Sequence, residues 1–128
     1  MAKPEKTQRR EFYRMALEID IYYKAMEAAK EEEYQKLTTT DLSAGGFRCC
    51  NEIKFEEGVF LNCMLIAGYE ALPVTAQILK SQPDAENPDL YDTRAIFYEL
   101  DDQIRDRVVR YIFSRQRQLQ SRLHKKKF

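Results

Sequence analysis

Short apolar runs with alternating polarity, separated by turn residues, make up most of the first hundred residues of this 128-residue chain. Between Met15 and Tyr23, one side of the chain carries Leu17, Ile19, Ile21 and Tyr23, and the other side carries Glu18, Asp20 and Tyr22. A period of two is typical of a β-strand with one buried face. The chain has room for one domain with one core, and it has no apolar run near the ~20 residues of a membrane helix.

Five later segments also have the length and composition of strands. They cover residues 33–41, 47–50, 59–67, 72–80 and 93–100, and in the segment 72–80 we expect Val74, Ala76 and Ile78 to face one way. Turn residues separate them, most clearly in the segment 81–92 with its two prolines. Residues 25–32 lack an apolar stripe, so we expect a charged connection or a short helical turn there. Six short strands at this spacing predict a small antiparallel β-barrel or sandwich.

The apolar spacing becomes helical after residue 101, at Ile104, Val108, Tyr111 and Ile112. Asp101 and Asp102 can cap the start of a helix, where negative charge is favourable. We therefore expect a helix over about residues 102–122, with its first half packed on the strands. The chain then divides into a flexible arm at 1–8, a barrel domain at 9–101 and a helix with a basic tail at 102–128.

The formal net charge of zero conceals strong charge segregation. Residues 1–14 have five basic and two acidic groups, residues 15–102 have seven and 18, and residues 103–128 have nine and one. The net charges are +3, −11 and +8. Two basic ends that flank an acidic middle indicate an anionic ligand or surface.

The cysteines and the histidine do not indicate catalysis or metal binding. Cys49, Cys50 and Cys63 show no CxxC spacing, and the sole histidine, His124, lies in the basic tail. We expect the cysteines to be buried apolar thiols, without a base to activate them. No set of residues suggests a metal site or an enzyme.

Two polar clusters flank the first two predicted strands. The segment from Arg9 to Arg14 precedes the first strand, and the segment from Asp41 to Gly46 follows the second. If these strands are neighbours, the clusters meet at one rim of the barrel. Guanidinium groups bind phosphate, stack on bases and pair with O6 and N7 of guanine. Taken alone, however, the arginines would fit a solvated basic segment and Asp41–Gly46 a simple β-turn.

Together the clusters contain Arg10-x-x-x-Arg14 and, some 30 residues later, Asp41-x-Ser43-x-x-Gly46. This pair resembles the signature of PilZ domains, bacterial receptors for the second messenger cyclic di-GMP. The resemblance covers roughly residues 9–118, and the segment from Tyr91 onward is similar to the last strand and helix of the family. It implies an all-β fold with a C-terminal helix, in which a six-stranded antiparallel β-barrel forms the domain.

The resemblance also implies ligand-binding roles for the arginines. Arg10 and Arg14 would wrap around cyclic di-GMP, contacting phosphate and the O6/N7 edge of a guanine and stacking on its plane. Arg9, just before the motif, would add a third cationic contact. Binding would order the N-terminal arm, residues about 5–14, against the rim of the barrel.

The turn would bind the other edge of the base. Asp41 and Ser43 would hydrogen-bond a guanine, while Gly45 and Gly46 would let the flat base approach the backbone. One departure from the family is Arg94, at a position where many members have a small residue. Arg94 assists binding if it faces the ligand rim and has no role there if it faces solvent.

These roles describe a cytoplasmic, non-enzymatic sensor whose ligand is cyclic di-GMP, without a metal or other cofactor. Its partner would be an effector protein, such as a flagellar motor component or a polysaccharide synthase, that controls motility, exopolysaccharide or biofilm. We expect a monomer or weak dimer without a transmembrane segment. The sequence leaves open whether one or two cyclic di-GMP molecules bind.

Two other functions remain open at this stage. The chain could be a β-barrel adaptor that contacts proteins through its C-terminal helix without nucleotide. It could also bind single-stranded nucleic acid, although the acidic middle argues against a long polyanion. The basic tail is a solvated helix end, or it contacts a protein or acidic lipids.

Overall fold

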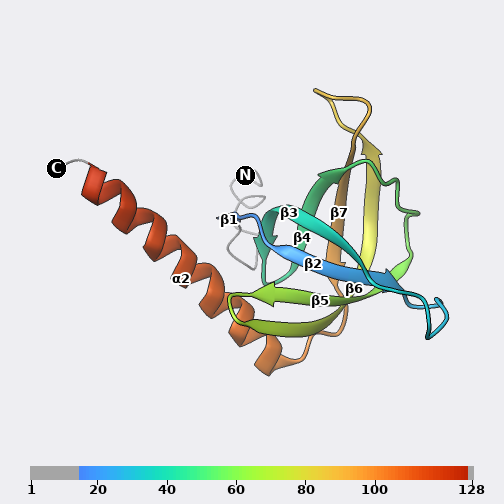
Figure 1. The fold of residues 1–128 in the computed structure, drawn as a ribbon, viewed down its shortest axis with the longest axis horizontal. Coiled ribbons are helices and arrows are strands. Elements are labelled where there is room, and N and C mark those ends of the chain that lie inside the picture. Colours follow the sequence, from blue (N-terminus) through green and yellow to red (C-terminus); the bar gives the residue numbers. More distant parts are fainter. Residues whose placement is uncertain (1–14, 127–128) are drawn as a thin grey trace, which may run out of the picture.

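The structure is a computed structural model that describes residues 15–126. Within this range, six antiparallel strands close into a barrel and a long helix leaves one end of it (Figure 1). The strands are β2 (Asp20–Ala25), β3 (Gln35–Ser43), β4 (Gly46–Asn51), β5 (Phe60–Ala67), β6 (Glu70–Pro83) and β7 (Tyr91–Phe97). They pair in the order β3-β2-β5-β6-β7-β4, and β4 pairs back to β3. The expected six-stranded antiparallel barrel with a C-terminal helix is therefore confirmed.

The first predicted strand is interrupted by a buried side chain. Its first piece, β1 (Met15–Ala16), pairs with the end of β3, and its second piece, β2, pairs with the start of β3. Between them, the Thr39 hydroxyl accepts a hydrogen bond from the Ile19 N–H at 3.1 Å and donates one to the Leu17 carbonyl at 2.6 Å. The side chain thus satisfies backbone groups where the strand is irregular.

The core lies inside the barrel and is built from alternate residues of the strands. The inward side chains predicted for the first strand are buried, namely Leu17, Ile19, Ile21 and Tyr23. Those predicted for the segment 72–80 are also buried, namely Val74, Ala76 and Ile78. The period of two therefore correctly identified which face of these strands is covered.

The strands around the 84–90 loop differ from the predicted boundaries. β6 continues through Pro83 and β7 begins at Tyr91, so part of the expected loop 81–92 is paired strand. Proline lacks an N–H and cannot donate to the ladder, and Pro83 is tolerated because it is the last residue of the strand. β7 ends at Phe97, before the predicted residue 100, and Glu99 has a positive φ of 49° where the chain turns toward the helix.

The helix α2 (Asp102–Lys126) covers one end of the barrel with its first turns and extends beyond the expected residue 122. Val108 and Ile112 are 0% and 2% exposed and join the barrel core. The Asp101 carbonyl accepts the Arg105 N–H at 2.9 Å, which begins the helical hydrogen bonding. Figure 1 shows the later turns extending away from the strands, consistent with their polar sequence.

Candidate functional site

The turn between β3 and β4 holds four of the predicted ligand-binding residues. Asp41 and Ser43 lie at the end of β3, Gly46 begins β4, and Gly45 is in the two-residue turn between them. β1 runs beside this turn, because Met15 pairs with Leu42. Arg9, Arg10 and Arg14 lie outside the described residues. Because Met15 pairs with Leu42, the chain segment that immediately follows Arg14 is next to the predicted Asp41 motif.

Ser43 organises the turn through its own hydroxyl. The side chain is 8% exposed, and its oxygen accepts a hydrogen bond from the Gly45 N–H at 3.1 Å. The same hydroxyl lies 3.4 Å from the Gly46 carbonyl, to which it donates. Such hydroxyl contacts with neighbouring backbone stabilise tight turns. The contacts of Ser43 in the structure are thus contacts within the turn.

Gly46 allows close approach of two strands. A Cβ atom at this position would overlap the carbonyl oxygen of Ala95 and lie 2.9 Å from the Cα of Ile96. Both neighbours belong to β7, which pairs with β4. A role in strand packing accounts for this glycine, in addition to the open floor for a base that the resemblance implies.

Asp41 lies on the outer face of the barrel beside Arg48, its partner across the β3–β4 pair. The Asp41 carboxylate is 3.8 Å from the Arg48 guanidinium, and the Asp41 side chain is 24% exposed. A bulge at Thr40 separates Asp41 from Thr39, so that Thr39 still points inward. The Thr40 hydroxyl donates to the Arg48 carbonyl at 3.2 Å.

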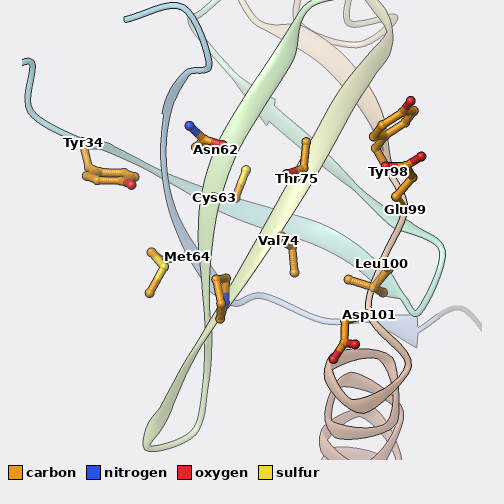
Figure 2. Close-up of a pocket in the computed structure, with 11 residues that line it drawn as sticks. Tyr34, Asn62, Cys63, Met64, Val74, Thr75, Tyr98, Glu99, Leu100 and Asp101 are labelled. Atoms are coloured by element: carbon orange, nitrogen blue, oxygen red, sulfur yellow. The ribbon is translucent and has the colours of Figure 1, made fainter. Parts of the chain in front are cut away.

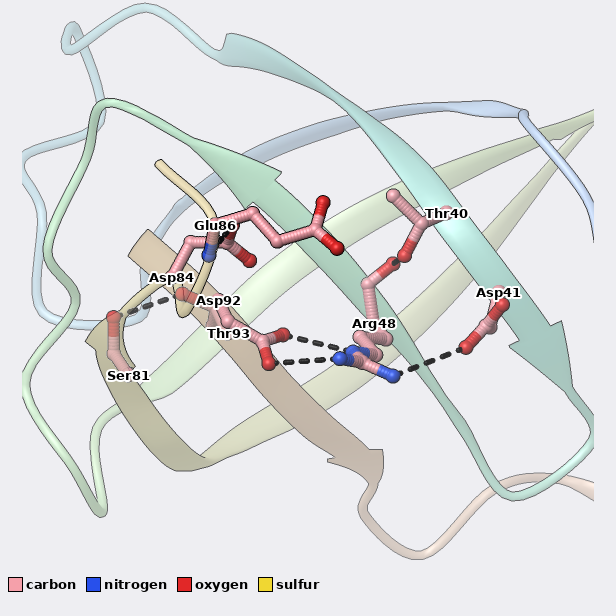
Figure 3. Close-up of polar contacts among 8 residues, drawn as sticks. All are labelled: Thr40, Asp41, Arg48, Ser81, Asp84, Glu86, Asp92 and Thr93. Atoms are coloured by element: carbon pink, nitrogen blue, oxygen red, sulfur yellow. Dashed lines mark hydrogen bonds and ion pairs between the residues drawn. The ribbon is translucent and has the colours of Figure 1, made fainter. Parts of the chain in front are cut away.

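Arg48 is held mainly by Asp92 of β7, as Figure 3 shows. Its Nε and Nη2 atoms donate to the two carboxylate oxygens of Asp92 at 2.8 and 2.9 Å. These hydrogen bonds hold the pKa of Asp92 below its usual range. Bidentate pairs of this kind fix both position and orientation of the guanidinium. Arg48 is thereby held with one side toward Asp41.

Sequence reasoning missed Arg48 and Asp92. The alternation Phe47-Arg48-Cys49 is a signal that Arg48 points outward, and the structure bears it out. The pairing of Arg48 with Asp92, however, depends on the contact between β4 and β7, which join residues 44 positions apart. Local sequence patterns do not encode which distant strands are neighbours.

A sequence model of the PilZ domain matches residues 8–114 of this chain. The chain belongs to the PilZ domain family. The matched range includes both predicted motifs, all seven strands described above and the first half of α2. A search of curated protein sequences found no match.

Solved structures share this PilZ fold. The PilZ domain of Escherichia coli YcgR with c-di-GMP has a TM-score of 0.67 and 18% identity, over 92% of this chain and 99% of that one. The K. pneumonia MrkH–c-di-GMP complex gives 0.71 and 17%, over 90% and 56%. The Bacillus subtilis inhibitor of motility MotI/DgrA gives 0.70 and 17%, over 85% and 52%. The chain thus spans about half the length of MrkH and MotI/DgrA.

A separate hollow of about 320 Å³ lies on another side of this PilZ barrel. Figure 2 shows Tyr34, Asn62, Thr75, Tyr98 and the junction before α2 around it. None of the predicted ligand-binding residues within the described range lines this hollow. The candidate site is therefore the surface at the β3–β4 turn, where Asp41 lies.

Two of the three cysteines of the PilZ domain are buried as expected, whereas Cys50 is only half-buried. Cys49 and Cys63 belong to the core, and burial raises the pKa of each to about 12. Such thiols stay protonated and unreactive near neutral pH. Within residues 15–126, no group of His, Cys, Asp or Glu is placed to hold a metal ion.

Among the described residues, no helical stretch combines the length and the apolar character that crossing a bilayer requires.

Proposed function

We propose that this PilZ domain is a non-enzymatic receptor for cyclic di-GMP. The observation that supports this most is the pairing of β1 with the end of β3. It brings the chain that follows Arg14 alongside Asp41 and the Ser43–Gly46 turn. In this proposal the arginine motif before β1 and the motif from Asp41 to Gly46, separated by some 30 residues in the sequence, border one surface. The YcgR and MrkH structures, both with c-di-GMP, support the same ligand class.

In this proposal each side of the surface recognises a different part of the ligand. Arg10 and Arg14, with Arg9 beside them, bind phosphate and the O6/N7 edge of guanine. The Asp41 carboxylate accepts hydrogen bonds from the N1–H and N2–H₂ groups of guanine. The Ser43 hydroxyl stabilises the turn and can still accept a further hydrogen bond. Gly45 and Gly46 keep the turn compact beside the base.

Ligand binding would then change the surface that an effector meets. New charge-assisted hydrogen bonds would fix the N-terminal arm against the rim of the barrel. The effector would be a protein that controls motility, exopolysaccharide or biofilm. The name of the similar Bacillus subtilis protein, an inhibitor of motility, supports this class of output. We also infer a cytoplasmic location, because a second messenger of this kind acts inside the cell.

Calorimetric titration of the full chain with cyclic di-GMP tests the proposal. We expect saturable binding, and we expect Arg10→Ala and Arg14→Ala each to weaken it more than tenfold. Each change removes a bidentate contact worth roughly 2 kcal/mol. Lys6→Ala, a charge loss in the same segment but outside the motif, is the matched control and should bind like wild type. The proposal fails if wild type gives no binding heat at tens of micromolar ligand.

A further inference from the structure

Three basic residues lie in one transverse row with Asp41 on the outside of the barrel. Asp41 is directly across from Arg48, Arg48 from Arg94, and Arg94 from Lys80, on the successive strands β3, β4, β7 and β6. Residues directly opposite each other on neighbouring strands share one face of the sheet. Arg94 and Lys80 are exposed, so this face is the outer one.

The inward neighbours confirm the direction of the row. The residues on either side of Arg48 are buried, and so are those on either side of Arg94. Ser81, next to Lys80, is 6% exposed and hydrogen-bonds Thr93 inside the barrel. Arg94 therefore faces outward in the same row as Asp41.

This row concentrates positive charge on an acidic barrel. Residues 15–102 contain seven basic residues against 18 acidic ones, and three of the seven are in the row. The other four are Lys24 at the end of β2, Lys30 in the loop after β2, Lys36 at the start of β3 and Lys54 in the loop after β4. Three of the seven basic residues of this acidic stretch thus lie together beside Asp41, with Asp92 and Asp84 near Arg48.

The three basic side chains of the row differ in their ion pairing. Arg48 is neutralised by its bidentate pair with Asp92. Within residues 15–126, neither Arg94 nor Lys80 makes a salt bridge, although the Arg94 charge helps to lower the pKa of Asp92 after the larger effect of the Arg48 hydrogen bonds. Neighbouring strands are about 4.8 Å apart, so the Arg94 backbone is about 10 Å from that of Asp41. A dinucleotide with one guanine at Asp41 has its phosphodiester groups within reach of such long side chains.

We propose that Arg94 and Lys80 extend the cyclic di-GMP site across the outer face of β7 and β6, where they bind a phosphodiester group of the ligand. The proposal rests on the proposed function, because it assumes that a guanine binds at Asp41. Arg48 lies between Asp41 and Arg94 in the row, and its bidentate pair with Asp92 balances its charge. A guanidinium and an ammonium are both good partners for a phosphodiester anion.

Calorimetric titrations with cyclic di-GMP at low and at physiological salt test this extension. We expect Arg94→Gln and Lys80→Gln each to weaken binding about three- to tenfold at low salt, and the double variant more. The double variant should also show a smaller loss of affinity with added salt, because fewer charge contacts remain to be screened. Lys36→Gln removes an equal charge from β3, five positions before Asp41, and should stay within about twofold of wild type.

The outcomes separate the two proposals. If wild type binds cyclic di-GMP and the double variant matches Lys36→Gln in affinity and salt dependence, the extension is wrong and the proposed function stands. Tighter binding by Arg94→Gln would also overturn the extension, because the side chain would then obstruct the ligand. Absence of binding by wild type would overturn both. All substituted residues are exposed, and thermal melting of each variant verifies that the fold is retained.

Discussion

Arg48 shows how one residue can link a structural pair to a candidate binding residue. Its guanidinium forms two hydrogen bonds with Asp92 and lies 3.8 Å from the Asp41 carboxylate. The Asp92 side chain is only 13% exposed, so its charge depends on this partner. The pair therefore stabilises β4 against β7 and, at the same time, sets the electrostatic surroundings of Asp41.

The Arg48–Asp92 pair predicts a specific pH dependence of stability. Hydrogen bonds from Arg48 hold the pKa of Asp92 below the ordinary value of 3.8. The pair therefore contributes fully above that value, and the contribution is lost as pH falls toward the lowered pKa. We expect Asp92→Asn to lower the free energy of unfolding by about 1–2 kcal/mol at neutral pH, because Arg48 is partly exposed.

Urea unfolding at neutral pH and at about pH 3 measures this effect. The difference between wild type and Asp92→Asn should shrink at the lower pH. Asp89→Asn, in the exposed 84–90 loop, is the control and should give a small difference at both pH values. An Asp92→Asn difference that is the same at both pH values would contradict the account of the pair.

Among the single elements, β3 closes the barrel by pairing with β4, and it also contains Asp41 and Ser43 of the candidate site. It pairs with β1 and β2 on one side and with β4 on the other. Thr39, 1% exposed, sits at its middle and bonds the backbone where β1 and β2 separate. The position of β1, and so of the chain that follows Arg14, depends on this buried hydroxyl.

Threonine and valine have nearly the same shape. Replacing Thr39 with valine should nevertheless destabilise the barrel, because the hydroxyl is lost. Thr39→Val keeps the volume but leaves the Leu17 carbonyl and the Ile19 N–H without these partners, and we expect a loss of about 2–4 kcal/mol. Thr38→Val is the matched control, because the Thr38 hydroxyl bonds Asp20 in an exposed position. Chemical denaturation of both variants measures the difference, and equal losses would show that the buried hydroxyl is unimportant.

Which elements form was predictable from local patterns, and how they meet was not. The period of two identified the buried faces of the first strand and of residues 72–80, and the helical spacing identified α2. The break at residues 17–19 was missed, because it arises from Thr39, some 20 residues away. Likewise, the prolines suggested a loop over 81–92, while pairing of Ser81–Pro83 with β7 makes strand there.

In the whole molecule, the acidic and basic segments of the sequence lie in different parts of the structure. The acidic residues belong mostly to the barrel and its loops, whereas α2 carries basic residues away from it. The sequence predicted an anionic partner from this asymmetry, yet the row formed by Arg48, Arg94 and Lys80 was not visible in it. These residues are far apart along the chain and share a face only through the closed order of strands.

Mapping of backbone amide shifts on isotope-labelled protein during titration with cyclic di-GMP tests whether the ligand binds at the β3–β4 turn. We expect the largest changes at residues 41–48 and 92–94, with little change in the loops at 30–33 and 56–58. Those loops lie away from the β3–β4 turn, in the connections after β2 and β4. Changes concentrated around Tyr34 and Tyr98, where the separate hollow lies, or no changes at saturating ligand would contradict the proposed site.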